Sequence, residues 1–332
     1  MNDRLLEILR CPSCGGALHV SGAKTTHNRI ESGRLICDEC PRGYSIDRFI
    51  PRFVSGENYA KNFGFQWNQF RLTQLDSHTG VPLSRVRFQA ETGWSEKELA
   101  GRRVLDVGCG AGRFAEIALA CGADVVAVDY SGAVDACWQN LGVHPKLSVV
   151  QADIYHLPFM GASFDYVYCF GVLQHTPKVR EAFLALPAQL KPGGGLTVDV
   201  YRRTFLNLLW SKYWLRPLTT RMSQDAVFRL VQAMVRYLFP ISLAMGRIPI
   251  FGRKLRFAIP VANYAGVFPL SPKQLREWAI LDTYDMLTPQ HDHPQSGKSL
   301  RRWFEEAGLE QVHVFQRGVY VGRGVKPAGN HR

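Results

Sequence analysis

The sequence predicts a doubly wound α/β fold with a mostly parallel, seven-stranded sheet, and two observations carry this prediction. Between residues 102 and 201, short β-rich runs alternate with stretches of helical character, and the pattern resumes over 299–326. Such alternation is typical of a parallel sheet covered by helices on both faces. Ahead of this region, residues 1–54 carry two CxxC pairs and too little apolar sequence to form a core without a staple.

Changes in the sequence pattern divide the chain into four parts. We expect a cysteine-containing ribbon at 1–54, a helical connector at 55–101, a core at 102–201 and 299–326, and an insertion at 202–298, where the alternation stops. The chain has 332 residues, of which 46% are hydrophobic and 20% charged. This composition is enough to bury a substantial core.

No targeting or membrane-spanning segment is predicted. The N-terminus lacks an apolar run between a basic start and a small-residue cleavage site. The most apolar stretch, 238–251, is interrupted by Pro240, Arg247 and Pro249, well short of the roughly 20 residues that a spanning helix needs. We therefore expect a cytoplasmic protein, in which the four cysteines outside the CxxC pairs are buried thiols.

The four N-terminal cysteines have the spacing of a structural metal site. Two tight turns, each holding a CxxC pair, are separated by 22 residues, which lets four thiolates converge on a tetrahedral zinc ion. A redox CxxC is the competing interpretation, and the presence of two matched pairs argues against it. A closed four-thiolate shell leaves no open position for a substrate. The predicted zinc ligands are Cys11, Cys14, Cys37 and Cys40.

The connector is predicted to form a helix over 58–70 with an aromatic face. Tyr59, Phe63, Trp67 and Phe70 recur there at helical spacing. We expect this face to cap the core.

A glycine-rich loop follows the first core strand. In VLDVGCGAG, Gly108, Gly110 and Gly112 come directly after the strand, and Arg113 opens a helix. Small residues let the backbone approach a ligand closely, and the helix N-terminus offers free N–H groups to a carboxylate. Because the residue three after Gly110 is Arg113, the loop departs from the GxGxxG pattern of dinucleotide sites.

Acidic residues end the next two predicted strands. Asp129, 17 residues past Gly112, can accept hydrogen bonds from both hydroxyls of a ribose. Asp153 ends the third strand, where its carboxylate or the adjacent amides can meet an adenine amino group. Each acid alone is equally well explained as a helix cap or a surface residue. Three strand ends facing one crevice match the rule for ligand sites in open α/β sheets.

This combination resembles the class I S-adenosylmethionine-dependent methyltransferases over 102–201 and 299–326. The matching segments are VLDVGCGAG, VVAVD, ADIYHLPF and LKPGG. The resemblance implies that Asp106 and the glycine loop hold the methionine moiety of S-adenosylmethionine, Asp129 its ribose and Asp153 its adenine. The cofactor contacts expected on this basis are Asp106, Gly108, Gly110, Gly112, Asp129, Asp153, Ile154 and Gln174.

A second resemblance covers residues 1–54. The segments LLEILRCPSCGGAL and GYSIDRFIPRFV are similar to the small zinc-ribbon proteins that bind and activate certain RNA and protein methyltransferases. This resemblance implies a binding or stabilising module and no part in the chemistry.

Candidate groups for the chemistry lie in two segments. FGVLQHTP follows the fourth core strand and places Gln174 and His175 at the lip of the crevice. A neutral histidine there can accept a hydroxyl proton; alternatively, it holds the loop or contacts the cofactor. The end of the insertion, DTYDMLTPQHDHPQS, is expected to lie as a loop over the substrate pocket, which adds Tyr284, Asp285 and His291 as catalytic candidates.

The insertion holds most of the excess positive charge. The formal net charge is +12, and between Arg202 and Arg256 eleven basic residues accompany one acid, Asp225. Segments 205–218 and 225–239 are mostly apolar with isolated cations. Three interpretations stay open: a buried lid or homo-oligomer interface, a helix lying on anionic lipid, or a surface that binds RNA phosphates.

The sequence therefore predicts a methyltransferase that acts on oxygen or nitrogen of a small-molecule, glycan or lipid-linked acceptor, in the cytoplasm with peripheral contact at the inner membrane face. The alternative is a methyltransferase of tRNA or rRNA that uses the ribbon and the basic insertion to bind RNA. An asparagine-proline tetrad typical of exocyclic amino methylation is absent from FGVLQHTP, which weakens the base-methylating form of this alternative. A non-catalytic binding protein is disfavoured because the glycine loop and both strand-end acids are intact.

Overall fold

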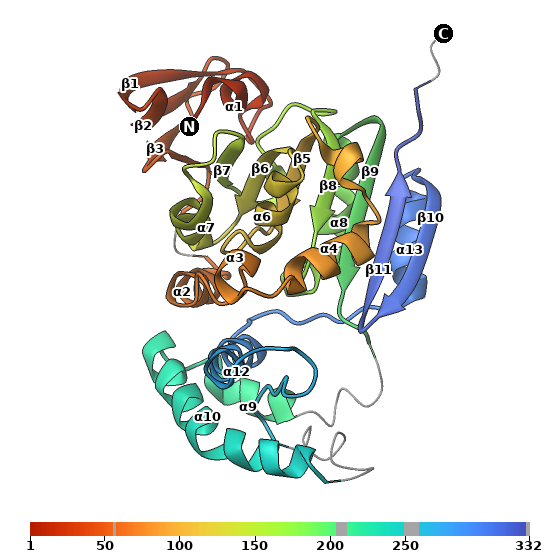
Figure 1. Cartoon of the computed structure of the whole chain (residues 1–332). Helices are drawn as coiled ribbons and strands as arrows, with labels where there is room; N and C mark the ends of the chain where they lie inside the picture. The colour runs from red at the N-terminus through yellow and green to blue at the C-terminus, as the bar shows by residue number, and fades with distance from the viewer. Residues whose placement is uncertain (56–57, 204–210, 249–258, 330–332) are drawn as a thin grey trace.

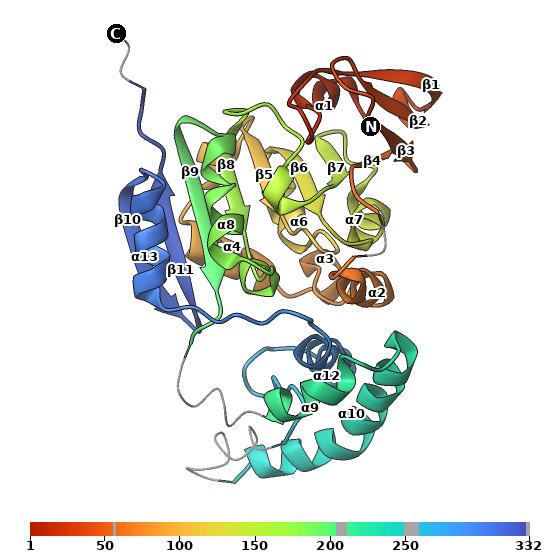
Figure 2. The ribbon, with the colours of Figure 1, turned by 180° about the vertical axis from the view of Figure 1, so that it is seen from behind.

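The computed structural model describes residues 1–55, 58–203, 211–248 and 259–329. Within these residues, one mixed sheet has the strand order β1-β2-β3-β4-β7-β6-β5-β8-β9-β11-β10, with helices on both faces (Figure 1, Figure 2). The core strands are β5 (Arg103–Val107), β6 (Asp124–Asp129), β7 (Leu147–Gln151), β8 (Phe164–Cys169), β9 (Leu190–Val200), β10 (Glu310–Arg317) and β11 (Val319–Val325).

These seven core strands confirm the predicted doubly wound sheet. Strands β7, β6, β5, β8 and β9 are parallel, whereas β11 pairs antiparallel with β9 and β10. Strands β5, β6 and β7 are almost entirely buried and mostly apolar in their interiors, as expected of strands covered on both faces. The chain runs outward from β5 to β6 and β7 on one side, and to β8 and β9 on the other. Where the chain order reverses next to β5, a crevice is expected at the carboxyl ends of the strands.

Three helices connect the parallel strands. Helix α6 (Arg113–Ala120) begins at Arg113 as predicted, and α7 (Ala133–Leu141) follows β6. Helix α8 covers Val179–Leu184, and a 3-10 turn follows from Pro187. Proline lacks the N–H that would continue the helix. Strand β9 then begins at Leu190, so that the LKPGG segment lies inside this strand.

The N-terminal ribbon adds four strands to the same sheet. Its elements are α1 (Asp3–Ile8), β1 (Leu18–Thr26), β2 (Arg29–Cys37), β3 (Gly43–Asp47) and β4 (Ile50–Arg52). Strand β4 pairs parallel with β7 at Arg52 and Gln151, and the Phe53 amide donates to the Gln151 carbonyl at 2.8 Å. The Arg29 guanidinium donates to the carbonyls of Gly142 and His144 at 2.7 and 2.8 Å. The ribbon is therefore continuous with the core.

The connector places four short helices beside the sheet: α2 (Lys61–Gln69), α3 (Asp76–Thr79), α4 (Leu83–Thr92) and α5 (Glu96–Leu99). The helix predicted over 58–70 is α2. It approaches α7 so closely that a Cβ on Gly64 would lie 2.9 Å from the Gly132 nitrogen. Phe70 packs against Phe228 of the insertion. The connector therefore joins the core to the insertion.

The described part of the insertion is helical, with its own apolar cluster, and lies beyond the strand ends (Figure 1). Its helices are α9 (Ser211–Thr219), α10 (Gln224–Gly246) and α12 (Pro272–Leu287), and α13 (Gly297–Glu306) then returns to the sheet. Val227, Val231 and Val235 of α10 are buried four residues apart and pack in a cluster with Ala279 and Leu287 of α12. The apolar segment 225–239 thus lies within α10 and buries one side against α12.

Part of the predicted basic segment, including Arg253, Lys254 and Arg256, lies outside the described residues, as does the start of segment 205–218. In the described ranges, α10 is the one helix long and apolar enough, by length and composition alone, to cross a membrane. The sequence predicts no segment that is long and apolar enough, because its most apolar stretch is 238–251. The helix instead begins at Gln224 and continues through Pro240.

The Arg52–Asp135 ion pair is expected to stabilise the joint between ribbon and core. Arg52 donates to Asp135 at 2.7 Å and to the Gln151 side chain at 2.8 Å, and both charged side chains are largely buried. We predict that Arg52→Gln lowers the free energy of unfolding by about 2 kcal/mol, because it leaves a largely buried carboxylate without its main partner. Urea unfolding of the whole chain measures this loss.

Arg48 offers a matched control, since it contacts the same Asp135 oxygen at 3.2 Å but its side chain is 63% exposed. Arg48→Gln should cost less than about 1 kcal/mol. Equal losses in the two variants would contradict the special role of Arg52.

Candidate functional site

A cavity of about 910 Å³ lies at the carboxyl ends of the core strands. Its walls come from the residues that follow β5, β6, β7, β8 and β9, and its roof comes from α2, α9 and α12. Cavities of about 300–1,000 Å³ are typical of ligand sites. This volume is near the upper end of that range and suits two ligands side by side.

The glycine loop forms one wall of the cavity. Gly108 has a φ of +81°, and a Cβ there would lie 2.1 Å from Val172 Cγ2, so no larger residue fits. A Cβ on Gly110 would lie 3.1 Å from the Trp67 ring, and both residues line the cavity. Gly112 is the N-cap of α6 and does not line the cavity. The loop thus brings bare backbone to the ligand space in front of a helix N-terminus.

Asp129 lies at the end of β6 and lines the cavity beside the loop. One carboxylate oxygen accepts from the Gly110 amide at 3.0 Å, and the other accepts from the Ser131 amide at 2.8 Å and hydroxyl at 2.7 Å. Burial raises the pKa of this carboxyl, and these hydrogen bonds oppose the rise. The Gly110-bound oxygen retains a lone pair that a ligand hydroxyl can use.

The other predicted cofactor residues are placed less directly. Asp106 is buried beneath the loop and does not line the cavity, and burial raises its pKa to about 8. The Asp153 carboxylate caps its own turn by accepting from the Tyr155 amide at 3.1 Å, while Ile154 lines the cavity. Gln174 is fully buried outside the lining. Asp106, Asp153 and Gln174 therefore support the wall from behind.

His175 lines the cavity with a defined tautomer. Its Nδ1 lies 2.9 Å from the His291 carbonyl oxygen, which only accepts, so Nδ1 carries the proton. Nε2 is then an acceptor, and it is buried without a hydrogen-bond partner among the described residues. Burial lowers the pKa of His175, and nearby Asp285 opposes this. The His291 ring lies against Tyr59 and His293 outside the lining, so His291 positions His175 through its backbone.

The expected loop at the end of the insertion is helical through Leu287, because Ser271 and Gln274 form a capping box that starts α12 with Pro272 at its first position. Asp282 and Asp285, three residues apart, share the face that lines the cavity. Tyr284 lies on the other side, fully buried against Phe65 and Phe228. Helical geometry thus turns Tyr284 away from the cavity, which does not support the catalytic role predicted for it.

A buried charge network lies beside the cavity and was not predicted. Arg87 of α4 lines the cavity, pairs with Glu91 at 2.9 Å and contacts the fully buried Asp199 of β9. Asp199 in turn accepts from the Gly171 amide at 2.6 Å. Burial raises the pKa of Glu91, and Arg87 opposes this rise. No local pattern in the sequence marks residues 112 positions apart as partners.

Asp282 lies at a polar corner of the cavity together with Tyr264, Trp278 and Arg113. Burial raises the pKa of Asp282 to about 7, while a hydrogen bond from Tyr264 lowers it. Burial lowers the pKa of Arg113 to about 10, which leaves it charged near neutrality. The Arg113 guanidinium donates to Gln74 and Ser84, both at 2.9 Å. This corner can bind a polar group of a second ligand.

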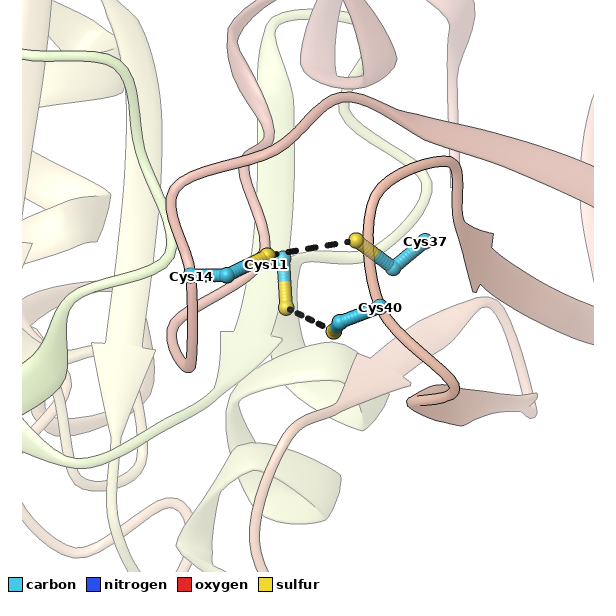
Figure 3. Close-up of side chains that lie close together, drawn as sticks. All are labelled: Cys11, Cys14, Cys37 and Cys40. Carbon is cyan, nitrogen blue, oxygen red and sulfur yellow. Dashed lines mark hydrogen bonds between the residues drawn. The ribbon is translucent and has the colours of Figure 1, made fainter.

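The four N-terminal cysteines come together away from the cavity (Figure 3). Their sulfur atoms all lie within 4.8 Å of one another, with Cys11–Cys40 at 3.7 Å and Cys14–Cys37 at 3.5 Å. Zinc–sulfur bonds of about 2.3 Å in a tetrahedron require sulfur separations of about 3.8 Å, so the cluster fits a zinc ion. The Glu39 amide faces the Cys37 sulfur at 3.4 Å and would support such a site from outside.

Two family models match the chain. One, described as a methyltransferase domain, matches residues 90–314, and the other, described as a Trm112p-like protein, matches residues 2–48. The first match covers more than half of the chain and includes the glycine loop, Asp129 and His175.

Similar proteins are known in several organisms. An uncharacterised protein of Synechococcus is 28% identical over 224 residues, which is 64% of this chain and 48% of that protein. The mitochondrial ubiquinone biosynthesis O-methyltransferase of Schizosaccharomyces pombe is 30% identical over 128 residues, which is 37% of this chain and 46% of that protein. The chain spans about half the length of these curated relatives.

Among solved structures, the complex between the Haloferax volcanii Trm112 methyltransferase activator and a methyltransferase is similar with a TM-score of 0.45 and 15% identity. The similarity covers 82% of this chain and 99% of that chain.

The cysteine cluster predicts one tightly held zinc ion per chain. Elemental analysis of freshly purified protein should find it, and Cys11→Ser combined with Cys37→Ser should abolish it, because thiolates supply the whole ligand set. Loss of the ion should lower the melting temperature by more than about 5 °C, since the ribbon has little other core. Cys121→Ser, outside the cluster, is the control and should retain zinc. Protein that contains no zinc, or a double variant that keeps it, would contradict the assignment.

Proposed function

We propose that this chain, which belongs to the methyltransferase-domain family, transfers the methyl group of S-adenosylmethionine to oxygen or nitrogen of a small or lipid-linked acceptor. One observation carries the proposal: a single cavity joins the glycine loop and Asp129 to a buried polar corner under α12. An enzyme that moves a group between two molecules must hold both at once in near-attack geometry.

The first half of the cavity suits the cofactor. The backbone of Gly108 and Gly110 offers close contact, Asp129 accepts from ligand hydroxyls, and Ile154 supplies an apolar wall. When bound, S-adenosylmethionine supplies an electrophilic sulfonium methyl. The Trp67 ring lies over Gly110 and gives this half of the cavity an aromatic wall.

The second half suits the acceptor. Asp282, with a pKa of about 7, can accept or donate a hydrogen bond near neutrality, and Arg87 and Arg113 provide fixed positive charge. Aromatic rings of Tyr264 and Trp278 line the same corner. A small acceptor with one polar end and an apolar body matches this lining.

His175 is the candidate general base. His175 lines the cavity, and its buried Nε2 is an unprotonated acceptor because Nδ1 donates to the His291 carbonyl. A bound acceptor hydroxyl that reached Nε2 would give up its proton there, while the cofactor would supply the methyl group and leave as its neutral thioether. The His291 backbone and the adjacent Phe63 and Tyr201 rings hold the imidazole in place.

Oxygen is the favoured acceptor atom. The Schizosaccharomyces pombe relative is an O-methyltransferase of ubiquinone biosynthesis, which supports a hydroxyl acceptor. The RNA alternative draws support from the Trm112p-like match over residues 2–48. Against it, the buried Lys212 and Arg216 at the cavity are engaged with Asp292 and are not presented to phosphates.

Asp129 should decide cofactor affinity. We predict that S-adenosylhomocysteine binds the wild type in the micromolar range in calorimetry, and that Asp129→Ala weakens binding by about tenfold or more, because a charge-assisted hydrogen bond is lost. Asp124→Ala, at the opposite end of β6, is the matched control and should bind normally. Unchanged affinity in Asp129→Ala would remove this residue from the cofactor site.

The reaction itself is tested with methyl-labelled S-adenosylmethionine. Purified protein is incubated separately with a total lipid extract, a water-soluble metabolite extract and total RNA. Label should enter the lipid or metabolite pool. His175→Gln should slow transfer by about 10²- to 10⁴-fold. Burial lowers the pKa of His175 below its ordinary value of 6.5, so the base stays neutral at that pH, and the wild-type rate should fall only at a pH below the ordinary histidine value, where protonation removes the base.

The pH profile separates a base from a structural histidine. If His175 only supported the loop, His175→Gln would keep the acidic limb of the wild type. Label found in RNA alone would reverse the choice of acceptor, and label in no pool would overturn the proposed methyl transfer to these acceptor classes.

A further inference from the structure

The insertion carries an exposed surface that mixes large apolar and cationic side chains. In the described part of the chain, six of nine exposed large hydrophobic residues belong to the insertion, with Trp214 exposed by 74% and Tyr237 by 66%. We call the outward sides of α9 and α10, together with the exposed residues that follow each helix, the insertion face. It consists of Trp214, Leu218, Arg221, Arg229, Arg236, Tyr237, Ile241, Arg247 and Ile248.

Helical spacing separates this face from the interior. On α9, Lys212 and Arg216 are buried at the cavity and bind Asp292, whereas Trp214 and Leu218 point outward, also four residues apart. On α10, the valine stripe packs towards α12, and the arginines occupy the opposite side. Figure 1 and Figure 2 both show α10 on the side of the insertion remote from the sheet.

The charge of the insertion face is almost entirely positive. Residues 211–248 contain six basic residues and one acid, Asp225. Two of the six, Lys212 and Arg216, are buried with Asp292, so the four arginines of the insertion face form the exposed excess. Cations interspersed with Trp, Tyr, Leu and Ile are the composition of helices that lie in a membrane interface.

We propose that the insertion face binds the surface of an anionic lipid bilayer, with α10 lying in the plane of the membrane. Apolar side chains would enter the headgroup region, and the arginines would contact lipid phosphates. One side of α10 is committed to α12, which favours an in-plane helix over a spanning one. This inference concerns binding alone and does not rest on the proposed methyl transfer.

Charge and side-chain chemistry favour lipid over two other occupants. A second copy related by a two-fold axis would bring the same arginine-rich patch against itself, which like-charge repulsion opposes. RNA would be held mainly through phosphates and stacked bases. Aliphatic Leu218, Ile241 and Ile248 add nothing to such a contact, but their burial in lipid is favourable.

The membrane contact would also place the cavity roof next to the bilayer. The same helix, α9, lines the cavity with one side and forms the insertion face with the other. A lipid-linked acceptor would then need to move only a short way from the membrane to the polar corner.

Vesicle co-sedimentation of the full chain tests the proposal. Vesicles of phosphatidylglycerol and phosphatidylcholine should bind the protein, and vesicles of phosphatidylcholine alone should bind it much more weakly. Arg229→Gln combined with Arg236→Gln should weaken binding to the anionic vesicles by about 10- to 30-fold. Arg301→Gln with Arg302→Gln, which removes the same charge from the exposed side of α13, is the matched control and should bind as wild type.

Salt separates the apolar part of the contact from the ionic part. Between about 0.1 M and about 1 M salt the screening length falls from about 10 to about 3 Å, yet some wild-type binding should survive through apolar burial. Trp214→Ser combined with Ile241→Ser should weaken the vesicle binding that remains at high salt by about tenfold or more. Val143→Ser, which replaces an exposed apolar residue outside the insertion, is the control and should leave the high-salt binding unchanged.

Absence of binding to anionic vesicles would overturn the proposal, as would an equal loss of vesicle binding in the two arginine double variants. Binding that disappears completely at high salt would also contradict it. A fourth contradicting result is protein that does not bind vesicles but self-associates, with the Trp214 and Ile241 substitutions abolishing the self-association. Unaltered melting temperature and S-adenosylhomocysteine affinity in each variant show that the fold is intact. Loss of methyl transfer with retained vesicle binding would count against the proposed function alone.

Discussion

The hydrogen bonding of β5 between β6 and β8 is the constraint on which the site depends. Because the chain leaves β5 in one direction and later returns on its other side, the helices that connect the parallel strands diverge and leave a crevice at the strand ends, which α2, α9 and α12 roof over. The glycine loop after β5, Asp129 after β6 and His175 after β8 all line this crevice. The position of the cavity therefore follows from strand order, and the side chains that line it give it the chemistry on which the proposed methyl transfer rests.

The two additions to the core meet it in different ways. The ribbon joins the edge of the sheet through backbone pairing of β4 with β7, and its cysteines lie outside the cavity lining. The insertion instead packs across the strand ends and supplies Asp282, Asp285 and Arg216 to the cavity. The ribbon thus contacts the core at the sheet edge, away from the cavity, whereas the insertion contributes side chains to the cavity itself.

Buried charged residues make the part of the cavity proposed for the acceptor polar. Removing Arg87, Asp199 and Glu91 from water is costly, and their mutual contacts offset much of this cost. Such a network holds its members rigidly, and Arg87 also lines the cavity. The raised pKa of Asp282, caused mainly by burial, gives the same region a group that can change protonation near neutrality.

The sequence alone determined the features that depend on local spacing: the alternating core, the two CxxC pairs, the glycine loop and the strand-end Asp129. Periodicity and turn chemistry act over a few residues, so they can be read along the chain. Only the tertiary structure decided that Asp282 faces the cavity while Tyr284 does not, that Arg87 meets Asp199, and that β4 extends the sheet. These outcomes depend on how distant segments pack, and packing leaves no mark in short-range sequence patterns.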